Sequence, residues 1–214
     1  MQTEQAESVL VMQFSKWPEK GRVKTRLAAG LGEQGALDAH ICLTLAVLDQ
    51  LHGSGYDLRF LWDRALADVP AAAAPILSRL AALGVRQDVQ QGGVLGERME
   101  AALAAALGGY SRAIIVGSDC PSVDADYVRQ AVTALDSKDV VLGPSDDGGY
   151  VLIGARTCVP GMLDNIRWGT EWALSETLER LDSSGLSCEQ LAARWDVDEP
   201  GDWQRFLRQF PGYF

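Results

Sequence analysis

Apolar residues along the chain form short runs and helix-spaced stripes that alternate from one end to the other. Compact runs rich in Val, Ile, Leu and Phe predict β-strands, whereas apolar residues that recur every three or four positions predict amphipathic helices. The predicted strands are residues 9–15, 57–63, 85–91, 113–117, 139–143, 150–155 and 191–198. The predicted helices are residues 35–51, 71–84, 96–109, 124–135, 172–185 and 203–210. This alternation predicts a three-layer α/β fold, in which a mostly parallel sheet carries helices on both faces.

The length, composition and charge of the chain argue against several classes of protein. The 214 residues can bury one substantial core and contain neither an internal repeat nor a low-complexity linker, so we interpret residues 1–214 as a single domain. A net charge of −10 without a basic stripe argues against a nucleic-acid-binding protein, but it leaves room for a small anionic substrate. The chain has no apolar run long enough for a membrane helix, and its polar, acidic start is unlike a signal peptide. We therefore expect a cytoplasmic protein without a membrane partner.

Cationic residues gather directly after the first predicted strand. That strand ends at Ser15, and Lys16 and "PEKGRVKTRL" follow, with cations on both sides of Gly21. Ligands of open α/β sheets bind at the carboxyl ends of the strands. If Thr25 lies near the start of a helix, backbone N–H groups and cationic side chains would converge there and suit a phosphate. The alternative is a solvated basic loop without a ligand. The predicted phosphate-binding residues are Ser15, Lys16, Gly21, Arg22, Lys24 and Arg26.

Three aspartates follow predicted strands. Asp119 comes just after the strand at 113–117, and Asp196 and Asp198 end the last predicted strand. Residues two apart in an extended chain point the same way. Carboxylates that meet at one sheet edge could share a hard divalent cation such as Mg²⁺ or Mn²⁺. The alternative is that Asp119 and Asp198 each cap a following helix.

The stretch "GPSDDGGYVLIG" (143–154) turns between two predicted strands. A plain hairpin would account for it, because Asp-Gly is a strong hairpin signal. A double glycine, however, lets the backbone approach a ligand closely, and a neighbouring carboxylate can accept a proton from a sugar hydroxyl. We therefore interpret Asp146 and Asp147 as candidate catalytic residues.

Together these stretches resemble a known bacterial family. The motifs "FSKWPEKGRVKTRL", "LGERM", "VGSDCPSVD", "GPSDDGGYVLIG", "IRWGT" and "DVDEPGDW" occur in the family's order and run nearly end to end. The family consists of small GT-A-like proteins, formerly a domain of unknown function, that are regarded as glycosyltransferases associated with radical-SAM and selenodomain proteins. Its wider relatives are the phospholactate and molybdenum-cofactor guanylyltransferases. The resemblance implies a nucleotide-diphosphate-sugar transferase (GT-A-like) fold.

The resemblance also implies roles for particular residues. It implies that Asp119 is a metal ligand and that the basic loop binds phosphate. It also implies that Asp196 and Asp198 correspond to a pair of aspartates near the end of the guanylyltransferase sequences. The chain departs from the family's loop at Trp17, where a small residue is usual. The residues that the motifs imply for substrate binding are Gly96, Glu97, Arg98, Gly148, Gly149, Tyr150, Trp168 and Thr170.

We therefore expect a metal-dependent transferase that uses Mg²⁺ or Mn²⁺ to bind a nucleotide sugar and transfers its glycosyl group to a small acceptor. The alternative is a guanylyltransferase-like nucleotidyltransferase, which releases pyrophosphate from a nucleoside triphosphate. A third possibility is a non-catalytic nucleotide sensor, because a fold does not dictate a reaction.

Overall fold

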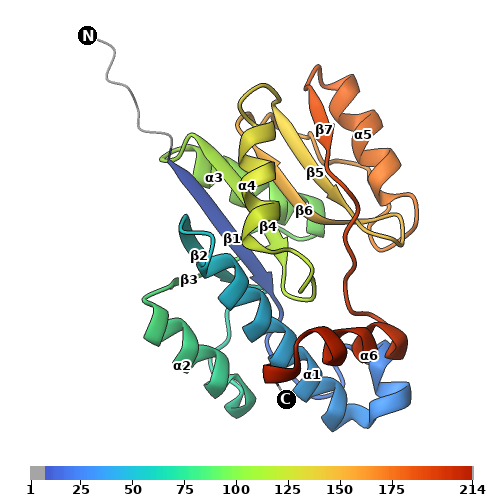
Figure 1. The fold of residues 1–214 in the computed structure, drawn as a ribbon. Coiled ribbons are helices and arrows are strands. Elements are labelled where there is room, and N and C mark those ends of the chain that lie inside the picture. The colour runs from blue at the N-terminus through green and yellow to red at the C-terminus, as the bar shows by residue number, and fades with distance from the viewer. Residues whose placement is uncertain (1–7, 214) are drawn as a thin grey trace.

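The alternating pattern builds one seven-stranded sheet in a computed structural model that describes residues 8–213 (Figure 1). The strands are β1 (Val9–Ser15), β2 (Asp57–Trp62), β3 (Arg86–Val89), β4 (Arg112–Gly117), β5 (Val140–Pro144), β6 (Tyr150–Ala155) and β7 (Cys188–Gln190). The helices are α1 (Thr25–His52), α2 (Ala74–Leu83), α3 (Leu95–Leu107), α4 (Ala125–Ala134), α5 (Ala173–Ser183) and α6 (Pro200–Gln209). Short 3-10 turns lie at Ala71–Ala73 and Pro211–Tyr213. The first seven residues of the polar N-terminal stretch lie outside the described part.

The strand order confirms the predicted mostly parallel sheet. The strands lie in the order β3-β2-β1-β4-β6-β5-β7. β1 is central and pairs in parallel with β2 and β4, and β6 is antiparallel to both β4 and β5. The carboxyl ends of β1, β2 and β4 therefore meet at one edge, and the loops that follow these strands can share a ligand.

Helices cover both faces of the sheet because the apolar side chains of the central strands alternate between them. Val9 and Val11 of β1 pack with α1 and α4, whereas Leu10 and Met12 pack with α3. Burying each such side chain contributes about 1.5–3 kcal/mol. The three-layer prediction is confirmed.

Helix α1 begins ten residues before the predicted start at 35, at Thr25, and has a kink at Gly32, whose φ of 71° is left-handed. Its early turns form a separate cluster with α6, in which Leu27 of α1 is buried with Trp203 and Phe206 of α6. Figure 1 shows α6 lying beside α1 at the end of the molecule where β1 finishes. The extra turns thus put the start of α1 next to the carboxyl edge of the sheet.

The prediction of a last strand over 191–198 is wrong. Strand β7 ends at Gln190, and beyond it a single bridge joins Arg194 to Ser145. Trp195 and Val197 are buried with α1 and α6 instead of facing the sheet, and the N–H of Val197 donates to the carbonyl of Asp119 at 3.0 Å. The alternation of "WDVD" therefore reflects an extended segment that crosses the strand ends.

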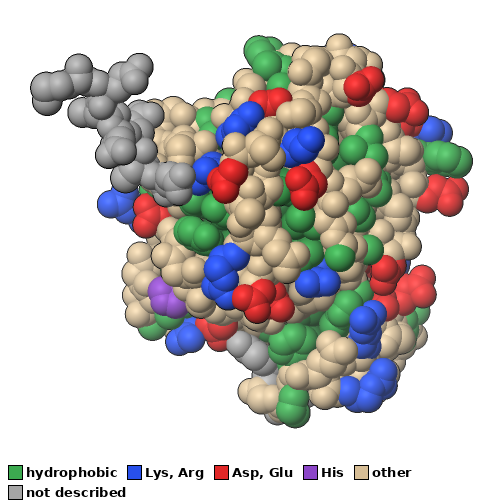
Figure 2. All heavy atoms as spheres, turned by 45° about the horizontal axis from the view of Figure 1, so that its top comes forward, with side chains coloured by type: hydrophobic (Ala, Val, Ile, Leu, Met, Phe, Trp, Pro, Cys, Tyr) green, Lys and Arg blue, Asp and Glu red, His purple; other side chains and the backbone are tan. Residues whose placement is uncertain are grey.

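Figure 2 shows acidic and basic side chains interspersed over the face that it displays. Within residues 8–213, no helix is both long and apolar enough to cross a membrane.

Candidate active site

The loop after β1 is anchored by an aromatic side chain. Trp17 is 6% exposed and stacks on Trp62 of β2, with ring centroids 3.7 Å apart. Its backbone N–H donates to the Asp63 carboxylate at 2.9 Å, and its indole N–H donates to the carbonyl of Arg64 at 2.8 Å. Trp17 therefore ties the first half of the loop to the end of β2.

The second half of the loop leads into the start of α1. Thr25 is the first helical residue, as the phosphate hypothesis required, and Lys24 precedes it in a left-handed conformation (φ 47°, ψ 44°). No side chain caps the first turn and no acidic residue lies within it. Unpaired N–H groups at a helix start attract anions.

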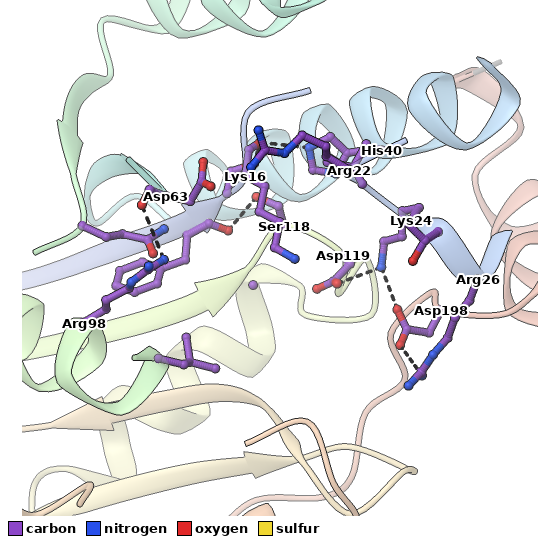
Figure 3. Close-up of a pocket in the computed structure, with 17 residues that line it drawn as sticks. Lys16, Arg22, Lys24, Arg26, His40, Asp63, Arg98, Ser118, Asp119 and Asp198 are labelled. Atoms are coloured by element: carbon purple, nitrogen blue, oxygen red, sulfur yellow. Dashed lines mark hydrogen bonds and ion pairs between the residues drawn. The ribbon is translucent and has the colours of Figure 1, made fainter. Parts of the chain in front are cut away.

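A cavity of about 400 Å³ opens between this loop and the ends of β1 and β4. Figure 3 shows Arg98 and Asp63 at one end and Lys24, Arg26 and Asp198 at the other. Of the predicted phosphate-binding residues, the cavity lining contains Ser15, Lys16, Arg22, Lys24 and Arg26. Gly21 is not among the lining residues, and its φ of 76° shapes the loop instead.

A buried polar network supports the floor of the cavity. Gln13 of β1 is fully buried, and its amide donates to the carbonyl of Thr44 and to the hydroxyl of Ser118, both at 3.0 Å. Ser118 in turn donates to the carbonyl of Phe14 at 2.8 Å. His40 lines the cavity, and its Nε2 lies 3.0 Å from the carbonyl oxygen of Lys16. Burial lowers the pKa of His40 to about 4, so the imidazole is neutral at pH 7.

At the end of the cavity formed by the start of α1, two cations and two carboxylates form three ion pairs. Lys24 Nζ lies 2.8 Å from Asp119 Oδ2 and 3.0 Å from Asp198 Oδ1, and Arg26 lies 2.8 Å from Asp198 Oδ2. Burial opposes both charges of the Lys24–Asp119 pair, but their attraction prevails. It lowers the pKa of Asp119 to about 2 and raises the pKa of Lys24 above its ordinary range. The pair is therefore ionised at pH 7.

Asp119, Asp196 and Asp198 come together as the sequence predicted. Each offers a carboxylate oxygen, and the three oxygens lie within 4.8 Å of one another, close enough to hold a metal ion. Among the described ion pairs, none joins Asp196 to Lys24 or Arg26. Burial, followed by the charges of the neighbouring aspartates, raises the pKa of Asp196 to about 7. The cluster thus carries one more carboxylate than its two cations neutralise, which suits a divalent cation with oxygen ligands.

Replacing Asp196 by asparagine is expected to stabilise the metal-free protein at pH 8 and to change its stability little at pH 4. The folded protein holds the Asp196 proton up to about pH 7, whereas an ordinary carboxyl releases it near 3.8. The stability from this group is therefore lost as pH rises through that window, by roughly 2–4 kcal/mol. Urea unfolding in EDTA at pH 4, 6 and 8 measures the difference between variant and wild type. The same difference at pH 4 and pH 8 would contradict the prediction.

The alternative that Asp119 and Asp198 cap helices is wrong. The N-cap of α4 is Asp124, whose carboxylate accepts from the N–H of Tyr127 at 2.8 Å. The N-cap of α6 is Glu199. Both helices have other caps, so Asp119 and Asp198 are left to face the cavity.

The turn that carries Asp146 and Asp147 lies outside the cavity lining, and both side chains are exposed. Asp147 accepts hydrogen bonds from the hydroxyl of Ser145 and from the N–H of Gly149, the latter at 3.1 Å. The charge of Asp147 contributes to the raised pKa of Asp196, so the turn approaches the acidic cluster. Gly148 has a φ of 87°, and a Cβ there would lie 2.3 Å from the carbonyl oxygen of Glu171. Only glycine lets the turn pack this closely.

In the "LGERM" motif, Arg98 alone among the three predicted residues is part of the described cavity lining. Its guanidinium donates to the carbonyl of Asp63 at 3.4 Å. Gly96 is buried, and a Cβ there would lie 2.6 Å from the carbonyl oxygen of Leu163. Glu97 accepts from the N–H of Gly93 at 2.7 Å. Gly96 and Glu97 therefore shape the start of α3.

The predicted substrate residues Tyr150, Trp168 and Thr170 also make internal contacts. Tyr150 meets Trp168 edge to face, with ring centroids 6.0 Å apart. Thr170 donates to the carbonyl of Arg167 at 2.7 Å. The cavity lining does not bring these residues together with the basic loop.

Sequence reasoning missed several residues of the lining. Asp63 and Gln90 directly follow β2 and β3, so the strand-end rule that found Asp119 could have found them too. Leu95 and Val23 carry no chemical signal in the sequence. The residues that line the cavity without having been predicted are Phe14, Val23, Thr25, His40, Asp63, Gln90, Leu95, Gly117 and Ser118.

Comparison with known proteins gives the chain a family. Residues 56–170 match a family described as "Uncharacterized protein conserved in bacteria (DUF2064)". A proposed nucleotide-diphospho-sugar transferase from Desulfovibrio desulfuricans is 32% identical, over 95% of this chain and 88% of that chain, and its crystal structure superposes with a TM-score of 0.83. No curated protein sequence matches the chain.

More distant structures have the same fold. A nucleotidyl transferase from Methanothermobacter thermautotrophicus has a TM-score of 0.62 at 14% identity, over 95% of this chain and 98% of that chain. Rv0371C from Mycobacterium tuberculosis, solved in complex with manganese, has a TM-score of 0.55 at 18% identity, over 94% and 97%. The predicted nucleotide-diphospho-sugar transferase fold is thus confirmed. By its sequence match and its fold, the chain belongs to the bacterial DUF2064 family.

Proposed function

We propose that the chain is a metal-dependent transferase that binds a nucleotide sugar and transfers its glycosyl group to a small acceptor. The observation that carries the proposal is the cavity at the carboxyl ends of β1 and β4, where a cationic helix start faces the carboxylates of Asp119 and Asp198. A polyphosphate and a divalent cation are the ligands that such a pair of surfaces suits best.

The carboxylates of Asp119, Asp196 and Asp198 would hold the cation. The raised pKa of Asp196 supports this assignment, because it arises first from burial and then from the negative charges of the neighbouring aspartates, which a bound cation would offset. Mg²⁺ or Mn²⁺ bound there would neutralise the charge of the departing diphosphate. The manganese complex of the Mycobacterium tuberculosis relative is in keeping with such a site.

The chain's own residues would bind the diphosphate and orient the sugar. Arg22 and Lys24, with the N–H groups at the start of α1, would contact the phosphate oxygens. Asp147 is proposed to accept the proton of the acceptor hydroxyl, since the turn that carries it is exposed and approaches the acidic cluster. Fixed donors aimed at the leaving phosphate are typically worth about 100-fold or more in rate.

Nucleotidyl transfer is the second candidate. The cations along the cavity would also suit a triphosphate, and the Methanothermobacter structure of the same fold is a nucleotidyl transferase. In this reaction an acceptor attacks the α-phosphate and pyrophosphate leaves. The guanylyltransferases that the sequence resembles catalyse this type of reaction.

The bond that breaks distinguishes the two reactions. We expect the protein, incubated with a panel of nucleotide sugars and Mn²⁺ or Mg²⁺, to release nucleoside diphosphate slowly from at least one of them, and to stop when EDTA is added. A parallel panel of nucleoside triphosphates tests for pyrophosphate, and chromatography separates the products. Pyrophosphate with untouched nucleotide sugars would replace glycosyl transfer by nucleotidyl transfer. Binding without turnover in both panels would contradict an enzyme and favour a nucleotide sensor.

A further inference from the structure

The Lys24 ammonium contacts two of the three carboxylates that a metal ion would use. It bridges Asp119 and Asp198 at 2.8 and 3.0 Å, and its side chain is only 6% exposed. Both carboxylates are 38% exposed, so ions can reach them from the cavity. Figure 3 shows Lys24 pointing from the start of α1 toward both carboxylates.

We propose that Lys24 is an internal counter-ion that a divalent cation displaces, and that the displaced ammonium then binds a phosphate group of the substrate. Metal and phosphate would consequently bind with positive coupling. The inference rests on the proposed function, since it concerns the same metal and the same phosphates, but it adds an order of events that the proposed function does not require.

Charge and burial require the displacement. An ammonium and a divalent cation repel each other strongly at hydrogen-bond distances in a partly buried site. Three carboxylates within 4.8 Å of one another favour the doubly charged ion. Lys24 must then leave Asp119 and Asp198, while Arg26, at 64% exposure, can turn into solvent.

The position of Lys24 limits where its ammonium can go. The residue immediately precedes α1, and its side chain lines the cavity. A buried ammonium without an anionic partner is costly. Its flexible four-carbon stem can carry the charge toward an anion at the start of α1. A phosphate there would restore the partner that the metal removes.

The backbone conformation of Lys24 is consistent with a residue whose side chain is held in place by ion pairs. Its left-handed conformation is uncommon for any residue other than glycine, asparagine or aspartate. Such strain persists when surrounding contacts compensate for it. In the metal-free protein the two ion pairs of Lys24 supply that compensation.

A calorimetric titration with Mn²⁺ alone tests whether Lys24 and the metal ion compete for the carboxylates. Lys24→Met keeps the aliphatic stem and removes the ammonium, and we expect it to bind Mn²⁺ about tenfold more tightly than wild type, within the usual range of coupling between sites. Lys20→Met is the matched control, because Lys20 is an exposed lysine of the same loop outside the cavity lining. It should bind Mn²⁺ with nearly the wild-type affinity.

Lysine acetylation read by mass spectrometry tests the displacement itself in the wild-type protein. Lys24 should be protected without metal and become reactive in saturating Mn²⁺, whereas Lys20 should react equally in both. A Lys24 that stays protected with Mn²⁺ bound, or equal Mn²⁺ affinity in wild type and Lys24→Met, would overturn the inference and leave the proposed function intact. Absence of Mn²⁺ binding in every variant would overturn both.

Discussion

Asp119→Asn is expected to lower metal-dependent product formation by about 100-fold or more. Asp119 supplies one of the three clustered carboxylates and is also the partner of Lys24. Asparagine keeps the shape of the side chain but loses the charge, so both the proposed metal site and the orientation of the lysine are weakened. Product release from the responsive nucleotide sugar or triphosphate, measured across a range of Mn²⁺ concentrations, gives the size of the loss.

The stability of Asp119→Asn separates a lost ligand from a lost fold. The pKa of Asp119 is lowered to about 2, so the charge stabilises the metal-free protein, and asparagine should cost about 1 kcal/mol once its 38% exposure is allowed for. Asp126→Asn is the matched control, because Asp126 of α4 is 77% exposed and pairs with Arg129. It should change neither stability nor product formation appreciably. Full activity in Asp119→Asn would remove Asp119 from the site.

Trp17→Ala is expected to destabilise the protein by about 3–5 kcal/mol, the usual cost of truncating a buried aromatic side chain. The substitution removes the stack on Trp62 and the hydrogen bond to the carbonyl of Arg64. Because Trp17 anchors the loop that carries the proposed phosphate-binding cations, affinity for a nucleoside diphosphate should fall as well. Urea denaturation followed by circular dichroism measures the first effect and calorimetry measures the second.

Two further variants show which part of the Trp17 contact matters. Trp17→Phe keeps a six-membered aromatic ring against Trp62 but loses the indole N–H and the fused five-membered ring, so it should cost about 1–3 kcal/mol. Trp172→Ala makes the same change at a ring that is 48% exposed, over which Arg167 lies at 5.5 Å. It should cost less than about 1 kcal/mol. If Trp17→Ala were as stable as Trp172→Ala, Trp17 could not be the anchor of the loop.

The strands that were predicted correctly are those in which the burial of the residues matches the hydrophobic pattern of the sequence. β1, β4 and β6 are short apolar runs covered on both faces, and such runs have few other stable arrangements. The segment 191–198 misled because an extended chain with alternating residues looks like a strand whether or not a neighbour pairs with it. Its buried side chains, Trp195 and Val197, face α1 and α6. Whether these side chains face the sheet or the helices depends on the positions of helices that are distant in the sequence.

The sequence by itself determined six of the seven strands, the alternation of strands with helices, and the residues that follow the strand ends. Asp119 and the basic loop could be found because strand ends are local features and because ligands gather at that edge. The candidate metal ligands could likewise be identified from the sequence, because carboxylates that meet at one sheet edge suit a divalent cation.

Only the tertiary structure decided how these groups pair. Lys24 and Asp119 are 95 residues apart and Lys24 and Asp198 are 174 apart, and no local pattern records that their side chains meet. The same holds for the raised pKa of Asp196, which arises from burial and from the carboxylates of Asp119 and Asp147, which two other loops bring close, besides that of the neighbouring Asp198. Charge interactions depend on distance and burial in space rather than on separation along the chain. The groups of the site were therefore readable from the sequence, whereas their electrostatic coupling was created by folding.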